Sequence, residues 1–200
     1  MAYIFGSTVP MPNVDLRAPM ATKKANPSWI DIKAKLADFD RDGLLGLLQD
    51  LYAASKDNQA FLHARLRLGD DVLKPYKATI SRWLWPDVFK NQDISVAKAK
   101  KAIADYKKAG GPTGGLAELV VFYCEQDSGF CAEVGQDDES HFDALVRMFE
   151  HALKTIATLP EANRPSLWKR LNAVRQRSHN IGYGVGENMD ELLAEHGVDD

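Results

Sequence analysis

The chain has 200 residues, of which 45% are hydrophobic and 26% charged, so it can bury the core of one domain and global disorder is excluded. Its formal net charge of −3 gives no argument for a nucleic-acid or acidic partner from bulk charge. No run approaches the ~18 apolar residues of a membrane-spanning helix, and no secretory signal opens the chain. We therefore expect a soluble, cytoplasmic protein without a membrane partner.

Residues 1–27 contain four prolines and no periodic apolar pattern, which predicts a flexible or extended N-terminal arm. Tyr3, Ile4 and Phe5 make part of this arm apolar, so it is a candidate partner-binding segment. The remaining residues, 28–200, are predicted to form one all-helical domain.

From Ser28 onward, apolar residues recur at helical spacing, and no run alternates with the period of two that a strand requires. Ser28 and Asp31 have the spacing of a capping box. The fold class is therefore all-α: a single-domain multi-helix bundle or a short irregular solenoid of antiparallel helix pairs. About nine helices are expected, near residues 28–39, 40–52, 57–68, 71–84, 95–109, 116–134, 137–156, 165–174 and 189–194.

Residues 38–43, Asp-Phe-Asp-Arg-Asp-Gly, match the opening of a calcium-binding loop. Gln49 occupies the twelfth position, where such a loop needs a bidentate glutamate. Leucines at helical spacing from Leu44 to Leu51 also predict a helix where the loop would have to be. We therefore interpret Asp40 as the cap of a helix.

The small net charge hides a basic segment followed by an acidic one. Residues 65–108 carry eleven basic and five acidic side chains, whereas residues 118–161 carry two basic and ten acidic ones. Lysines with nearby aromatics can hold phosphates and stack bases, but they can equally form a solvated helix face or pair with the acidic segment. The candidate nucleic-acid or anion-binding residues are Lys98, Lys100, Lys101, Lys107, Lys108 and Arg82.

The acidic segment also raises the possibility of a metal site. Its oxygen ligands and one histidine suit a divalent cation, but their spacing matches no metal motif, so we predict no metal and no cofactor. The residues considered are Glu125, Asp127, Glu133, Asp137, Asp138, Glu139 and His141.

The two cysteines, Cys124 and Cys131, are seven residues apart in a helical stretch, which places them too far apart for a disulfide. We interpret them as small buried apolar residues in a reducing compartment. No nucleophilic motif is present and the five histidines are scattered, so no catalytic residue is assigned.

Three segments resemble a bacterial family of all-helical proteins of unknown function. They are residues 98–109, residues 44–66 with their Asn-Gln-Ala-Phe-Leu sequence, and residues 116–149. The resemblance covers roughly Ile30 to Leu159. It implies an all-helical domain, but no activity, ligand or catalytic residue.

Three functions are consistent with these patterns. The first is a non-enzymatic helical interaction or scaffold protein that binds a protein partner or itself. The alternative is a salt-sensitive, weakly specific nucleic-acid-binding protein that uses the Lys-rich helix 95–109. A third is an enzyme with a site assembled from scattered histidines and acidic residues.

Overall fold

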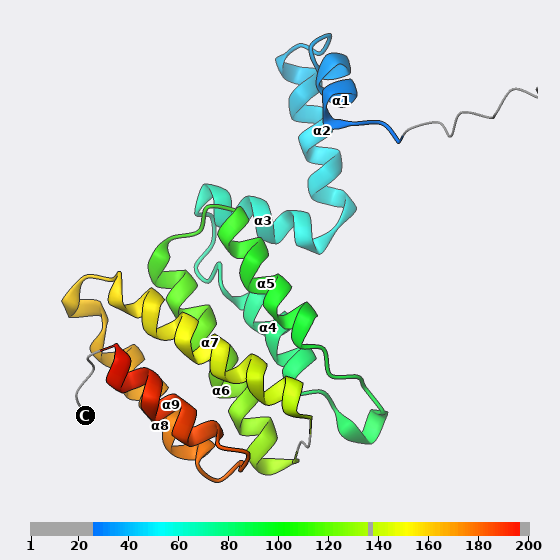
Figure 1. Ribbon diagram of the computed structural model, residues 1–200. Coiled ribbons are helices and arrows are strands. Elements are labelled where there is room, and N and C mark those ends of the chain that lie inside the picture. The colour runs from blue at the N-terminus through cyan, green and yellow to red at the C-terminus, as the bar shows by residue number, and fades with distance from the viewer. Residues whose placement is uncertain (1–25, 136–137, 197–200) are drawn as a thin grey trace, which may run out of the picture. The chain divides into compact units, whose positions relative to one another are not determined.

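The computed structural model describes residues 26–135 and 138–196, and these residues are helical without any strand (Figure 1). The predicted all-α, multi-helix fold is confirmed. Nine α-helices form within the described ranges: α1 (Trp29–Leu36), α2 (Arg41–Ala54), α3 (Lys56–Leu66), α4 (Lys74–Leu84), α5 (Val96–Lys108), α6 (Thr113–Glu133), α7 (Glu139–Ala157), α8 (Pro165–Ser178) and α9 (Val185–Glu195). Two short 3-10 helices, Val88–Lys90 and Glu161–Asn163, lie in the links.

Polar side chains begin several helices where the sequence predicts. The capping box at α1 is present, because Asp31 accepts from the Ser28 backbone N–H at 2.7 Å and the Ser28 hydroxyl accepts from Asp31 N–H at 3.4 Å. Asp40 accepts from the Gly43 N–H at 2.7 Å, and α2 begins at Arg41. The calcium-like motif is therefore the start of a helix, as predicted.

Other helix ends differ from the predicted ones. Helix α4 begins at Lys74, because the Asp71 carboxylate accepts from the N–H groups of Leu73 and Lys74 in a turn before it. Helix α9 begins four residues earlier than expected, at Val185. Gly184, with a φ of 71°, takes the left-handed conformation at its N-cap.

The chain divides into two compact units, residues 1–45 and 46–200, with the boundary inside α2. The described part of the first unit comprises α1 and the beginning of α2, and it contains no buried side chain. The sequence places the division after residue 27 instead. The predicted arm residues Tyr3, Ile4 and Phe5 lie outside the described residues.

Helix α6 is the centre of the second unit, where it packs against α4, α5, α7 and α8 (Figure 1). Eleven of its 21 residues are buried, as expected of a helix surrounded by others. Gly129 lies four residues before its last residue, Glu133. A Cβ there would be 2.4 Å from the Trp85 ring, so glycine is what allows that ring to lie against α6.

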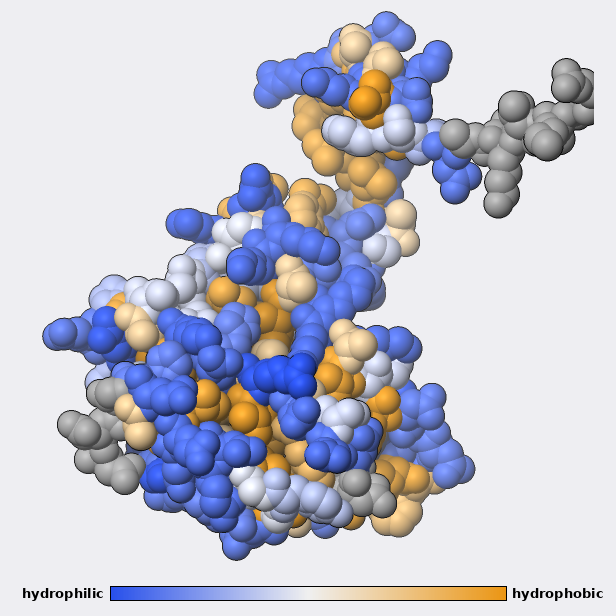
Figure 2. All heavy atoms as spheres, viewed as in Figure 1, coloured by the Kyte–Doolittle hydropathy of each residue, from blue (hydrophilic) through white to orange (hydrophobic). Residues whose placement is uncertain are grey.

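Apolar side chains remain exposed on α1 and α2, where orange spheres follow these helices in Figure 2. No helix in the described ranges is both long and apolar enough to cross a membrane. The exposed apolar residues of these two helices are Trp29, Ile30, Ile32, Leu44, Leu45, Leu48, Leu51 and Tyr52.

Candidate functional sites: a lysine-lined groove and a buried polar cluster

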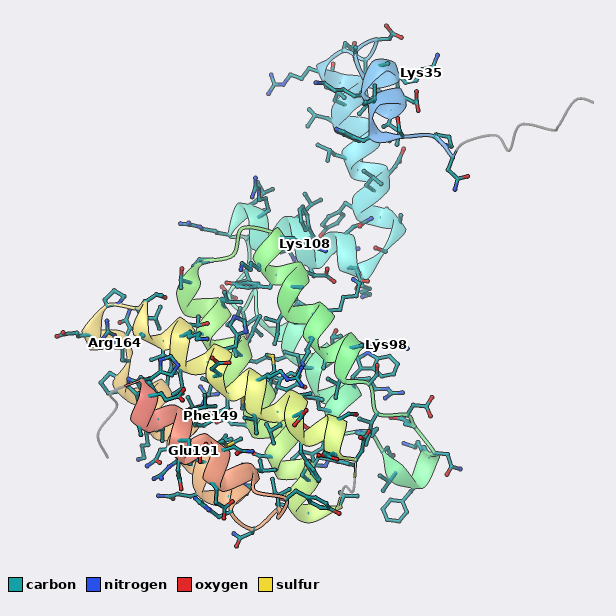
Figure 3. All side chains as sticks on the ribbon, in the orientation of Figure 1. Lys35, Lys98, Lys108, Phe149, Arg164 and Glu191 are labelled. Carbon is teal, nitrogen blue, oxygen red and sulfur yellow. The ribbon has the colours of Figure 1, made fainter. Side chains whose placement is uncertain are left out.

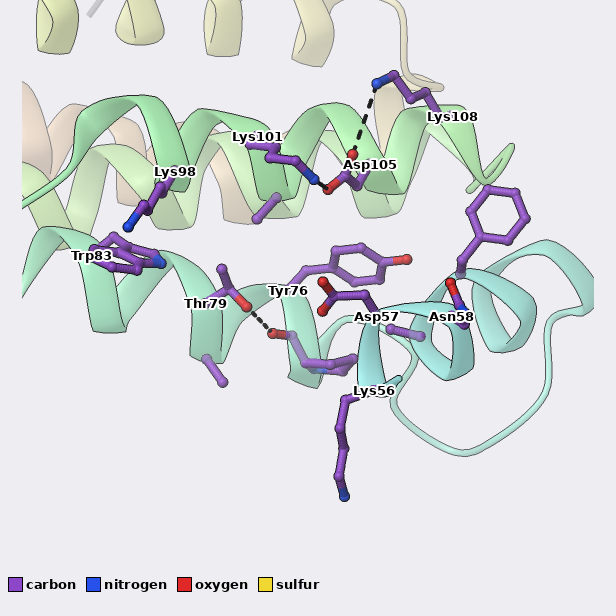
Figure 4. Close-up of a pocket in the computed structure, with 15 residues that line it drawn as sticks. Lys56, Asp57, Asn58, Tyr76, Thr79, Trp83, Lys98, Lys101, Asp105 and Lys108 are labelled. Carbon is purple, nitrogen blue, oxygen red and sulfur yellow. Dashed lines mark hydrogen bonds and ion pairs between the residues drawn. The ribbon is translucent and has the colours of Figure 1, made fainter. Parts of the chain in front are cut away.

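A groove of about 710 Å³ lies between α3, α4 and α5 in the second unit (Figure 4). Part of its lining is apolar and part is charged. The apolar residues are Ala60, Phe61, Pro75, Ala78 and Ala102. The charged residues are Lys56, Asp57, Lys98, Lys101, Asp105 and Lys108, which together carry a charge of +2 from four lysines and two aspartates.

Two aromatic residues shape the groove. The Lys98 Nζ lies 3.8 Å from the centroid of the Trp83 ring, and the Arg82 guanidinium carbon lies 4.5 Å from it, so both cations interact with this ring. Tyr76 lies deeper, and its buried hydroxyl has no hydrogen-bond partner among the described residues. Burial, together with the nearby charge of Asp105, raises the pKa of Tyr76 to about 12, so the hydroxyl stays a neutral donor.

Asp105 forms ion pairs with two lysines on one wall of the groove. Its two carboxylate oxygens lie 2.5 Å from Lys101 Nζ and 3.9 Å from Lys108 Nζ, and dashed lines in Figure 4 mark both pairs. The hydrogen bond to Asp105 raises the pKa of Lys101. The wall is therefore of mixed charge.

Three of the six predicted cationic residues line the groove, and three do not. Lys98, Lys101 and Lys108 share one face of α5 and line the groove, with Lys98 and Lys108 near opposite ends of the helix (Figure 3). Lys100 instead faces the interior, where burial lowers its pKa. Burial and the positive charge of Lys107 lower the pKa of His151 on α7. The five lysines of helix 95–109 therefore do not all lie on one face of the helix.

A second site is buried between α6 and α7. Tyr123, Asp127 and Cys131 lie four residues apart on α6, which places them on one face of the helix. His141, in the first turn of α7, places its Nε2 2.5 Å from Asp127 Oδ1, and the Cys131 thiol lies 4.0 Å from the same oxygen. The exposed fractions of Asp127, His141 and Cys131 are 0%, 4% and 5%.

Burial and the Asp127 charge control the protonation of this cluster. Burial raises the pKa of the Cys131 thiol to about 12, with Asp127 contributing to the effect. Burial also raises the pKa of Tyr123. For His141, burial opposes the charged form, but the hydrogen bond to Asp127 together with the negative charges of Asp127 and Asp138 outweighs it, and the pKa is raised.

The sequence interpretation considered Asp127 and His141 together as possible metal ligands, but it missed Cys131, which it placed among the small buried apolar residues. The steps of four between residues 123, 127 and 131 are the signal that could have united three of its members. Other members of the acidic group lie elsewhere. Asp138 caps α7 through the Ser140 N–H, Glu133 and Glu139 are exposed, and Asp137 lies outside the described residues.

An ion-pair network joins α4, α6 and α8. Arg170 donates to both carboxylate oxygens of Glu125, at 2.8 and 2.6 Å, and to Glu118 at 2.6 Å. Lys77 Nζ lies 2.7 Å from the other oxygen of Glu118. Lys77 comes from the basic segment of the sequence and Glu118 from the acidic one, so the two segments pair inside the fold at this point.

No family model, curated protein or solved structure matches this chain. The resemblance to a bacterial helical family therefore stays a prediction, and the function has to be argued from the two sites. The groove offers an apolar surface edged by cations, which suits binding. The buried cluster offers nitrogen, oxygen and sulfur atoms in an enclosed space.

Proposed function

We propose that the protein is a non-enzymatic binding module whose groove between α3, α4 and α5 takes an acidic, amphipathic segment of a protein partner. The observation that carries this proposal is the combination of an apolar lining with a lysine edge in one groove of about 710 Å³. An amphipathic helix inserts its apolar face into such a groove, while its flanking carboxylates pair with the lysines.

The same groove favours a protein over a nucleic acid. Asp57 and Asp105 line it among four lysines and repel phosphates and carboxylates alike, so the distinction rests on Trp83. A base that stacked on Trp83 would compete with Lys98 and Arg82, which already lie over the ring. Binding of nucleic acid through helix 95–109 is therefore the second candidate, supported by the lysine count of α5 and not by the layout of the groove.

Selection from a displayed library of random peptides tests this proposal, because it requires no assumption about the identity of the partner. The full chain serves as bait, and a 20-residue single-stranded oligonucleotide serves as a separate probe. We expect enriched peptides to combine acidic residues with leucine or phenylalanine at helical spacing. Lys98→Glu together with Lys101→Glu should weaken the best peptide at least tenfold, because both changes reverse charges at the groove edge.

Lys107→Glu is the matched control, because Lys107 lies on the same helix, is exposed and does not line the groove. It should leave peptide binding unchanged. Enriched peptides without acidic residues, or equal losses in the groove and control variants, would overturn the proposal. Tight, salt-sensitive binding of the oligonucleotide with no peptide binding would favour the second candidate instead.

A further inference from the structure

The buried cluster has the composition of a transition-metal site. A carboxylate oxygen of Asp127, the Sγ of Cys131 and a ring nitrogen of His141 all lie within 4.8 Å of one another. Each of the three side chains is buried. We propose that Asp127, Cys131 and His141 form a closed, structural binding site for Zn²⁺ or a similar divalent transition-metal ion.

The donor atoms select the class of ion. Calcium and magnesium bind oxygen ligands almost exclusively, so a thiolate and an imidazole argue against both. Zinc accepts sulfur, nitrogen and oxygen together, usually in a tetrahedral arrangement. Cobalt(II) shares this preference for ligands and serves as its spectroscopic substitute.

Two further polar atoms in the cluster point to an additional ligand. Asp127 Oδ2 and the Tyr123 hydroxyl are fully buried, and neither makes a hydrogen bond of normal geometry among the described residues, although Asp127 is close enough to the Tyr123 hydroxyl to help raise its pKa. Burying such a group without a partner is unfavourable, and more so when the group is charged. A cation bound beside Asp127 removes this cost for the carboxylate. The Tyr123 hydroxyl lies one turn away on the same face of α6, where it can bond to a ligand oxygen or complete the coordination.

The ion would replace the short contact between Asp127 and His141. Their atoms are 2.5 Å apart, whereas two ligands of a tetrahedral zinc ion with bonds of ~2.1 Å are about 3.4 Å apart. Binding thus requires the two side chains to separate by about 1 Å and the proton between them to leave. His141 lies in the first turn of α7, where a side-chain rotation achieves this without moving the helix.

Charge balance permits the bound state, because the site is neutral with or without the ion. The thiol of Cys131 releases one proton to solvent, and the imidazolium of His141 releases the proton that it shares with Asp127. The divalent ion is then balanced by one thiolate and one carboxylate, so the site remains neutral. A neutral site avoids the free-energy cost of burying an unbalanced charge between α6 and α7. Lys100 on α5 is a nearby cation.

Metal titration of the full chain tests the proposal. The protein is dialysed against a chelator and a reductant, and Zn²⁺ or Co²⁺ is then added. We expect one ion per chain and a rise in the unfolding temperature with added Zn²⁺, because the ion binds the folded state. With Co²⁺ we expect visible bands typical of tetrahedral cobalt and a near-ultraviolet band from the thiolate ligand.

The two buried cysteines provide a matched pair of variants on one helix. Cys131→Ala should remove the thiolate band and weaken binding at least about 100-fold, since the loss even of an outer-shell partner costs 10–100-fold. Cys124→Ala should leave both unchanged, because its sulfur is outside the ligand set. His141→Gln and the control His151→Gln give a second pair in case Cys131→Ala does not fold, which circular dichroism checks. The proposal is overturned if the wild-type chain takes up no stoichiometric Zn²⁺ or Co²⁺, or if the thiolate band depends on Cys124 instead of Cys131.

Discussion

Gly129 determines how closely Trp85, after α4, approaches α6. The shortest distance from a Cβ at residue 129 to the Trp85 ring would be 2.4 Å, to Cζ3, and the ring's Cη2 would be 3.0 Å away. Trp85 also stacks edge-on against Phe130, with ring centroids 6.4 Å apart, so it has little room to withdraw. This packing accounts for a glycine within a helix despite its poor helix propensity.

We therefore predict that Gly129→Ala destabilises the protein by about 1–3 kcal/mol, the usual cost of overpacking a core. Gly114→Ala is the control, because Gly114 lies on the same helix and a Cβ there would meet nothing within 4 Å. That control should be neutral or slightly stabilising. Urea unfolding measures both, and equal effects of the two substitutions would contradict the packing argument.

The His141–Asp127 bond predicts a pH dependence of stability in the metal-free protein. The pKa of His141 is raised in the folded state, through its hydrogen bond to Asp127. Its contribution to stability is therefore fully present below the unfolded pKa of about 6.5 and is lost as pH rises through the higher folded value. Asp127 and Asp138 favour the imidazolium, whereas Lys100 and burial oppose it.

The measurement is the difference in unfolding free energy between the wild type and His141→Gln, followed from about pH 5.5 to about pH 9 in chelator. We expect a difference of about 1–3 kcal/mol at the acid end, as for a hydrogen bond to a charged group, and a smaller one above neutral pH. A difference that is constant over this range would show that the imidazolium is not the stabilising form.

At the scale of elements, Arg170 links helices that are distant in sequence. Its guanidinium bonds Glu125 and Glu118 on α6, and Glu118 also bonds Lys77 on α4. These side chains keep only 22–32% of their surface exposed, so the pairs are less screened than surface pairs. Removing Arg170 leaves one carboxylate half-buried without its bidentate partner.

We predict that Arg170→Met lowers the unfolding free energy by about 1–3 kcal/mol. The control is Arg147→Met on α7, whose partner Asp143 lies four residues away on the exposed face at 3.0 Å. An exposed helix pair of this kind contributes under about 0.5 kcal/mol. The two losses are compared by thermal unfolding at low and high salt, and similar losses would argue against a special role for the network.

The helices and their order along the chain could be predicted from the sequence, because each helix depends on a local pattern of residues. Ser28 and Ser95 each accept from a backbone N–H three residues on, at the starts of α1 and α5. Helix α9 begins earlier than predicted because Gly186 is packed against His179 instead of serving as a flexible link. A glycine's packing role is invisible in its sequence spacing.

The two sites could be predicted from the sequence only in part, because some of their contacts are local along a helix and others join different helices. Lys98, Lys101 and Lys108 share a face of one helix, so their proximity is local and the sequence indicates it. Lys56 joins them from α3, and His141 meets Asp127 across the turn between α6 and α7. Those contacts depend on how antiparallel helices are aligned, which a helical periodicity does not specify.

At the scale of the whole molecule, the core belongs to one of the two units. Every residue of the buried apolar cluster lies between Ala64 and Met189. In the first unit the described residues 26–45 contribute no buried side chain. The free energy of folding is therefore expected to come from the second unit, because apolar burial is its dominant favourable term.

This distribution predicts that residues 46–200 alone unfold at nearly the same temperature as the full chain, with a similar dependence on urea. The slope of the unfolding free energy against urea concentration scales with the surface exposed on unfolding, and residues that bury nothing add little to that surface. A chain that begins at Gly69 is the matched comparison, because it also lacks α3 with its buried Ala64 and the Ala60 and Phe61 wall of the groove. That shorter chain should unfold at a lower temperature and lose peptide binding, whereas residues 46–200 should keep both properties. A large loss of stability on removing residues 1–45 would mean that the first unit covers apolar surface of the second, and the exposed side chains of α1 and α2 would then have their partner within the chain.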